Sequence, residues 1–262
     1  MSEGHVQLGE VNTWFAEYGD GDPLVMLHPG GADGRAFGPN VDTLATGLRV
    51  YSPDRRGHGR TADVAGPISF ELMAQDTIAF LETVVGAPAH LVGYSDGAIV
   101  ALHVALRRPD LVRRVVLAAG VFHLDGWLPG VIDSEEEPAP FFAENYGEVS
   151  PDGIEHFGVV LAKTNRMHAE EPTFTDVDLQ GATVPVLVMV ADDDEMALEH
   201  SIALYRSLPG AELAVVPGTS HGLLVEKPTL CNTIILDFLT QDPITPIAPR
   251  RRSPGTVDAD GT

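Results

Sequence analysis

The apolar positions of this chain fall into two alternating patterns. Short runs such as 24–27 and 186–190 are apolar throughout, which is typical of strands covered on both faces of a parallel sheet. Between such runs, apolar residues recur every three or four positions, which indicates helices. Strands joined by helical crossovers predict a doubly wound α/β fold, with a mostly parallel eight-stranded sheet and helices on both faces.

The elements can be placed along the chain from this pattern and its turn residues. Strands are expected at 5–11, 13–18, 24–27, 49–53, the apolar residues leading to position 93, 115–118, 186–190 and 213–216. Helices are expected at 35–47, 69–85, 96–108, 196–208 and 223–239. Residues 1–120 and 179–240 are therefore predicted to form one α/β core domain.

The segment 121–178 has a different character from the rest. It carries 13 acidic and 2 basic residues, its helix signals are irregular, and Pro and Gly recur. We expect a small inserted helical lid, with one helix capped by Ser150 and carrying Pro151 in its first turn. Residues 241–262, with four prolines and no periodic apolar positions, are predicted to be a disordered tail.

The sequence Gly93-Tyr94-Ser95-Asp96-Gly97 joins an apolar strand to a helical pattern. A Gly-x-Ser-x-Gly run in this context predicts a nucleophile elbow with Ser95 at its tip. The flanking glycines are needed because a side chain at 93 or 97 would collide with neighbouring backbone in so sharp a turn.

A serine nucleophile needs a base to take its proton and an acid to orient that base. His221 follows a short apolar strand and precedes the last helix, which places it at the same sheet edge as Ser95. The acid is expected in the loop after strand 186–190, where 192–195 are all acidic. Asp194 is the preferred candidate and Asp193 the alternative.

The developing oxyanion also needs backbone N–H donors. The residue after the nucleophile, Asp96, is expected to supply one of them. Pro29 has no N–H, so the second donor in the loop after strand 24–27 is Gly30 or Gly31, with Gly30 preferred.

These motifs together resemble the α/β-hydrolase fold superfamily over residues 6–239. The resemblance rests on His28-Pro29-Gly30-Gly31, on the loop 54–59, on the elbow and on Gly218-Thr219-Ser220-His221. Two positions depart from the family pattern, since Ala191 replaces a glycine before the acid and Pro29 replaces the glycine after the histidine. Asp96 is similar to its counterpart in valacyclovirase or biphenyl-hydrolase-like esterases, which implies contact with a substrate amino group; the alternative is an anion that stabilises a helix start.

Other side chains are candidates for the substrate pocket or for structural roles. Cys231 lies on the apolar face of the last helix and is expected in the core. Arg55 and Arg56 are expected to pin their own loop. The candidate pocket residues are His28, Gly31, Asp96, Trp127, Phe141, Phe142 and Phe157.

The amino-acid composition limits the kinds of ligand that we expect the protein to bind. The net charge of −22 argues against binding to nucleic acid or to anionic membranes, so a small molecule is the expected ligand. No signal-like or membrane-spanning run is present, which favours a cytoplasmic protein. One cysteine and no Cys/His cluster predict neither a disulfide nor a metal or other cofactor site, and the sequence specifies no oligomeric state.

The sequence thus favours a cofactor-free serine hydrolase that cleaves a small carboxylic ester, or an activated amide or thioester, through an acyl-enzyme. Two alternatives use the same triad, for hydrolysis of a C–C bond or for haloperoxidase-type perhydrolysis. A further alternative is a ligand-binding protein of this fold that performs no reaction.

Overall fold

A computed structural model describes residues 1–132, 138–244 and 246–249. They include one eight-stranded sheet in the order β1-β2-β4-β3-β5-β6-β7-β8. β1 and β2 pair antiparallel, β2 pairs antiparallel with β4, and the other neighbours are parallel. The predicted mostly parallel, eight-stranded sheet is confirmed. The strands are β1 (Ser2–Leu8), β2 (Val11–Tyr18), β3 (Asp22–Leu27), β4 (Leu48–Pro53), β5 (Ala89–Tyr94), β6 (Val112–Ala118), β7 (Val186–Ala191) and β8 (Glu212–Val216).

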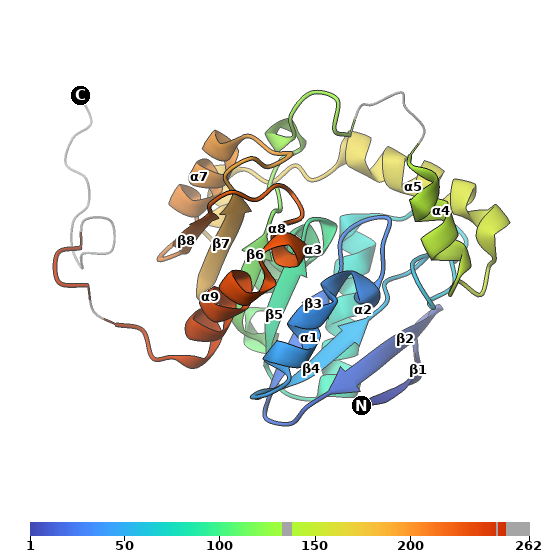
Figure 1. Ribbon diagram of the computed structural model, residues 1–262, viewed down its shortest axis with the longest axis horizontal. Helices are drawn as coiled ribbons and strands as arrows, with labels where there is room; N and C mark the ends of the chain where they lie inside the picture. Colours follow the sequence, from blue (N-terminus) through green and yellow to red (C-terminus); the bar gives the residue numbers. More distant parts are fainter. Residues whose placement is uncertain (133–137, 245, 250–262) are drawn as a thin grey trace.

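Helices cover both faces of this sheet (Figure 1). α1, α8 and α9 lie together on one face, and α2 packs beside α3 on the other. In the part of the chain that the structure describes, no helix is long and apolar enough to cross a membrane. The helices are α1 (Pro39–Leu44), α2 (Phe70–Phe80), α3 (Asp96–Arg107), α4 (Pro140–Gly147), α5 (Phe157–Glu170), α6 (Asp176–Leu179), α7 (Leu198–Ser207), α8 (Leu223–Glu226) and α9 (Pro228–Thr240).

Three of the predicted helices are interrupted or begin later than expected, each at a residue that disfavours continued α-helix. The helix expected at 35–47 is a 3₁₀ turn followed by α1, because Gly38 (φ 47°) separates the two and Pro39 begins α1. Pro228 divides the helix expected at 223–239 into α8 and α9. Gly153 (φ 75°) precedes a 3₁₀ turn, so α5 begins at Phe157 rather than near Ser150.

The order of the central strands gathers three loops at one edge of the sheet. β3 lies between β4 and β5, so the loops after all three strands meet where the parallel strands end. α4 and α5, from the segment between β6 and β7, lie over this edge (Figure 1). The predicted lid segment 121–178 includes residues 133–137, and the predicted tail includes residues 245 and 250–262; these positions lie outside the described residues.

Candidate active site

Ser95 occupies the turn between β5 and α3 with a positive φ that is rare outside glycine (φ 54°, ψ −119°). Its N–H donates to the carbonyl of Ala118 in β6 at 2.8 Å, which fixes the turn to the sheet. A Cβ added at Gly93 would lie 2.2 Å from the carbonyl oxygen of Gly97, and one at Gly97 would lie 1.9 Å from that of Leu27. The predicted steric need for both glycines is therefore confirmed.

A chain of hydrogen bonds connects the three residues predicted to form the triad. Nε2 of His221 lies 2.9 Å from Oγ of Ser95, and Nδ1 lies 2.7 Å from Oδ1 of Asp194. The backbone N–H groups of Ala191 and Glu195 donate to the Asp194 carboxylate at 3.0 and 2.8 Å. These bonds hold the carboxylate in place, so its orientation toward the imidazole is fixed by backbone rather than by solvent.

The acidic residues beside Asp194 in the sequence make other contacts. Asp193 is exposed, and its N–H donates to the carbonyl of Thr219 at 3.2 Å. Oδ1 of Asp192 accepts the Thr219 N–H at 3.1 Å. These two contacts tie the loop after β7 to the loop that carries His221, and the structure brings Asp194 rather than Asp193 to the imidazole.

The surroundings of His221 favour its protonated form. Burial lowers the pKa of the imidazole, but the hydrogen bond and charge of Asp194 outweigh burial and raise it above the ordinary value. Tyr94 Oη donates to the His221 carbonyl at 2.7 Å and fixes the loop. Ser95 is only 7% exposed and the His221 side chain 18%, so the hydrogen-bonded chain is almost enclosed.

Asp96 follows Ser95 and is buried in an ion pair that sequence reasoning missed. Its Oδ1 lies 2.9 Å from Nε2 of His168, which comes from α5. Burial raises the pKa of Asp96, but the charges of His168 and Arg55 and the His168 hydrogen bond lower it to about 2. Burial lowers the pKa of His168, but Asp96 raises it above its ordinary value. A lone histidine in an irregular segment carries no sequence signal for such a contact.

The loop after β3 packs directly against Asp96. A Cβ added at Gly30 would lie 2.3 Å from Oδ2 of Asp96, whereas one at Gly31 would lie 3.4 Å from the ring of Phe142 in α4. Gly30 is therefore the glycine beside the elbow. His28 is fully buried and lies beneath the loop, with its ring bonded to the Pro29 carbonyl, so it supports the loop instead of lining a pocket.

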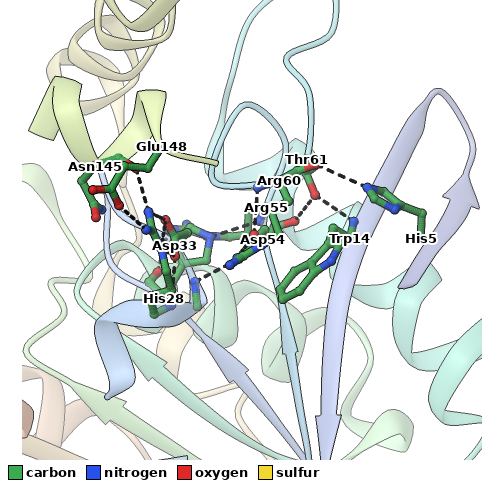
Figure 2. Close-up of polar contacts among 12 residues, drawn as sticks. His5, Trp14, His28, Asp33, Asp54, Arg55, Arg60, Thr61, Asn145 and Glu148 are labelled. Atoms are coloured by element: carbon green, nitrogen blue, oxygen red, sulfur yellow. Dashed lines mark hydrogen bonds and ion pairs between the residues drawn. The ribbon is translucent and has the colours of Figure 1, made fainter. Parts of the chain in front are cut away.

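The loop after β4 is held by a buried carboxylate (Figure 2). Asp54 accepts the backbone N–H groups of Gly34 and Arg60, each at 2.9 Å. Burial raises the pKa of Asp54 to about 6. Thr61 donates to the Asp54 carbonyl at 2.7 Å and accepts the N–H of Trp14 at 2.9 Å, which joins the loop to β2.

The aromatic pocket candidates lie at different depths. The Trp127 ring centroid is 5.9 Å from that of His221, and its buried Nε1 makes no hydrogen bond among the described residues. Phe142 covers Gly31, whereas Phe141 is 64% exposed. Phe157 packs on Tyr146 with ring centroids 5.6 Å apart. Of these aromatic rings, only Trp127 stands beside the His221 imidazole.

Comparisons with known proteins agree with this architecture. BpoC of Mycobacterium tuberculosis, named as a proposed non-heme bromoperoxidase, is 37% identical over 258 residues, covering 87% of this chain and 97% of BpoC. RutD of Azorhizobium caulinodans, named as a proposed carbamate hydrolase, is 25% identical over 257 residues, covering 88% and 96%. A hydrolase structure from Pseudomonas aeruginosa superposes with a TM-score of 0.75 at 22% identity, covering 91% and 98%.

A family pattern, described as the alpha/beta hydrolase family, matches residues 24–233. This range contains the elbow, the loop after β3 and the loops that carry Asp194 and His221. The family match spans most of the chain, and the similarity to BpoC covers 87% of it. The chain belongs to the alpha/beta hydrolase family.

Proposed function

We propose that the protein is a cofactor-free serine hydrolase that cleaves a small carboxylic ester, or an activated amide or thioester, through an acyl-enzyme. The observation that carries this proposal is the continuous hydrogen-bonded chain from Ser95 through His221 to Asp194, with the serine on a strained turn. Such an arrangement is characteristic of an activated serine nucleophile.

In the proposed reaction, Oγ of Ser95 attacks the substrate carbonyl carbon while Nε2 of His221 takes the hydroxyl proton. The resulting imidazolium is stabilised by the carboxylate of Asp194, which does not itself take the proton. Collapse of the tetrahedral intermediate breaks the bond to the leaving alcohol, and His221 returns the proton to that oxygen. A water molecule, deprotonated by the same imidazole, then attacks the acyl carbon. The second tetrahedral intermediate collapses with cleavage of the bond to Oγ of Ser95, which takes the proton back from His221 as the acid is released.

The negative oxygen of the intermediate is proposed to be bound by the N–H groups of Asp96 and Gly30. The N–H of Asp96 belongs to the first turn of α3, where N–H groups have no partner within the helix and the helix dipole favours negative charge. Gly30 is preferred to Gly31 because its Cα lies beside the elbow, whereas Gly31 faces α4.

The ion pair of Asp96 leads us to propose an uncharged substrate. Its Oδ1 is bonded to His168 and its charge also faces Arg55, so the carboxylate already has internal cations. Its Oδ2 accepts no hydrogen bond among the described residues, but it is buried against Gly30, so a substrate ammonium would have to enter this closed contact to reach it. The ion pair therefore favours the structural interpretation of Asp96 over recognition of a substrate amino group.

Two measurements test the proposal. We expect p-nitrophenyl acetate to give a burst of p-nitrophenol and a fluorophosphonate probe to label Ser95, with both lost in Ser95→Ala. Ser207, remote at the end of α7, offers a matched control, and Ser207→Ala is expected to keep both. Labelling at another residue, or turnover in Ser95→Ala, would show that Ser95 is not the nucleophile.

Substrate charge is tested with two aryl esters that share a leaving group. We expect a higher kcat/KM for the ester with a neutral acyl group than for the one with an aminoacyl group. A preference for the aminoacyl ester that disappears in Asp96→Asn would overturn the proposal of an uncharged substrate.

Haloperoxidase-type perhydrolysis is a second candidate, supported by the similarity to BpoC at 37% identity. Here hydrogen peroxide in place of water would attack the acetyl-enzyme, giving peracetic acid, which oxidises bromide. Ser95-dependent bromination of monochlorodimedone with acetate and peroxide, at a rate above that of ester hydrolysis, would favour this reaction over the first.

A further inference from the structure

Arg55 is a buried cation that forms no ion pair with a carboxylate in the part of the chain that the structure describes. It is 5% exposed, and burial lowers the pKa of its guanidinium to about 10. The adjacent Arg56 is equally buried, but it donates to the carboxylate of Asp76 at 2.6 and 2.8 Å. Asp96 and Asp54 act on this charge only through space, and burial of a charge without a carboxylate in direct contact is costly, so the position of Arg55 needs another explanation.

The guanidinium of Arg55 instead binds the backbone of the loop after β3 (Figure 2). Its Nη2 donates to the carbonyl oxygen of His28 at 2.6 Å and to that of Pro29 at 3.1 Å. Its Nη1 lies 3.4 Å from the sulfur of Met73. These contacts place the positive charge beneath the two peptide groups that precede Gly30.

The ring of His28 reinforces the same arrangement. The backbone N–H of Arg55 donates to Nε2 of His28 at 3.0 Å, so Nε2 carries a lone pair and the ring proton lies on Nδ1. Nδ1 then donates to the Pro29 carbonyl at 2.8 Å. Burial holds the pKa of His28 well below its ordinary value, in agreement with a neutral ring. The Pro29 carbonyl thus receives two donors from the protein interior.

Fixing this carbonyl also fixes the next N–H. The carbonyl of Pro29 and the N–H of Gly30 belong to one planar trans peptide, in which the two groups point in opposite directions. Because the carbonyl is held toward the interior by Arg55 and His28, the Gly30 N–H is turned away from the interior. We infer that Arg55 is a positioning residue that orients the Gly30 N–H toward the substrate oxyanion.

This inference rests on the proposed serine hydrolase function and is tested with three variants at position 55. Arg55→Met removes the donors and the charge, Arg55→Gln keeps amide donors without charge, and Arg55→Lys keeps charge with one donor group. Loss of one oxyanion donor typically lowers kcat by about 10²–10³-fold, and we expect Arg55→Met to approach this range with KM nearly unchanged. Arg55→Lys is expected to restore part of kcat.

The matched control is Arg56→Met, which removes a neighbouring buried guanidinium that contacts α2 but not the loop after β3. We expect it to lower the melting temperature while kcat stays near the wild-type value. Affinity for a trifluoromethyl ketone, which forms an oxyanion on Ser95, should fall in parallel with kcat in Arg55→Met. Circular dichroism and melting temperature identify which variants are folded, and Arg55→Lys and Arg55→Gln serve if Arg55→Met is not.

The possible outcomes distinguish a failure of the inference about Arg55 from a failure of the proposed hydrolase function. If the wild type shows Ser95-dependent turnover and the folded position-55 variants keep wild-type kcat, the role of Arg55 is overturned and the function stands. The same follows if they lose no more kcat than Arg56→Met. If the wild type shows no Ser95-dependent turnover, both are overturned.

Discussion

The ion pair between Asp96 and His168 joins α3 to α5, and we expect it to make stability depend on pH. The oxygen and nitrogen are 2.9 Å apart, and the Asp96 side chain is only 3% exposed. Replacing His168 by Gln leaves the Asp96 charge buried without its imidazolium. The pKa of Asp96 falls from 3.8 to about 2, which at about 1.4 kcal/mol per pKa unit corresponds to a net stabilisation of about 2 kcal/mol, and His168 is the largest of the groups that lower this pKa.

The sign of the pH dependence follows from the two pKa shifts. The pKa of His168 is raised, so its contribution is fully present below about pH 6.5 and is lost as the pH rises through the folded-state pKa. The pKa of Asp96 is lowered, so its contribution is present above pH 3.8 and is lost as the pH falls toward about 2. We therefore expect His168→Gln to lower the free energy of unfolding by about 2 kcal/mol at pH 6 and by less at pH 9.

Other charged groups facing this pair keep one state across that range. Burial lowers the pKa of His58 to about 4, so it is neutral at pH 6, and Arg55, with a pKa of about 10, remains charged at pH 9. His221 also titrates, but it does so in both proteins and cancels in the difference.

Urea unfolding at pH 6 and pH 9 measures the effect, with Arg166→Gln as the matched control on the same helix. Arg166 pairs with Glu170 at the surface, where the two side chains are 78% and 62% exposed, so a small, similar change is expected at both pH values. The double variant Asp96→Asn with His168→Gln should cost less than the sum of the single changes. An equal loss from His168→Gln at pH 6 and pH 9 would refute the ion-pair reasoning.

Three further predictions follow from steric and electrostatic features of the fold. Gly97→Ala should prevent native folding, because its Cβ would lie 1.9 Å from the carbonyl oxygen of Leu27. The control Gly158→Ala has open space around its Cβ and should yield soluble, folded protein, and a wild-type melting temperature for Gly97→Ala would contradict the prediction. Asp194→Asn should lower kcat for p-nitrophenyl acetate by about 10⁴-fold, while Asp193→Asn should keep a kcat near the wild-type value. If Asp193→Asn lost more activity than Asp194→Asn, Asp193 would be the acid of the triad. Cys231, whose pKa burial raises to about 11, should resist iodoacetamide at pH 8 until urea unfolds the protein, and rapid labelling of the native protein would count against its burial.

The parts of the fold that could be predicted from sequence are those with local signals. The apolar run 24–27 is entirely buried in β3, and Ser69 caps α2 by accepting the N–H of Leu72, as its sequence position indicates. The elbow was predictable because its two glycines, its strand and its helix are consecutive in the chain. Helix ends were less predictable, since the apolar period continues through Pro228, where the structure divides α8 from α9.

Contacts across long sequence separations could not be read from local patterns. Arg55 and Arg56 are adjacent and chemically identical, so nothing in the sequence shows that one binds a carboxylate and the other two carbonyl groups. His168 is 72 residues from Asp96, in a segment without regular periodicity. Choosing Asp194 over Asp193 likewise needed the backbone bonds that aim one carboxylate at His221.

The position of Asp96 poses an electrostatic problem that its neighbours resolve. Its carboxylate lies against Gly30, beside the proposed oxyanion site, where an uncompensated negative charge would oppose the negative charge of the intermediate. His168 and Arg55 both lower the pKa of Asp96, so two positive charges face the one carboxylate. These two neighbours offset the negative charge of Asp96 beside the proposed oxyanion site. Because α5 supplies His168, displacement of that helix would remove one of these charges and weaken the proposed oxyanion site.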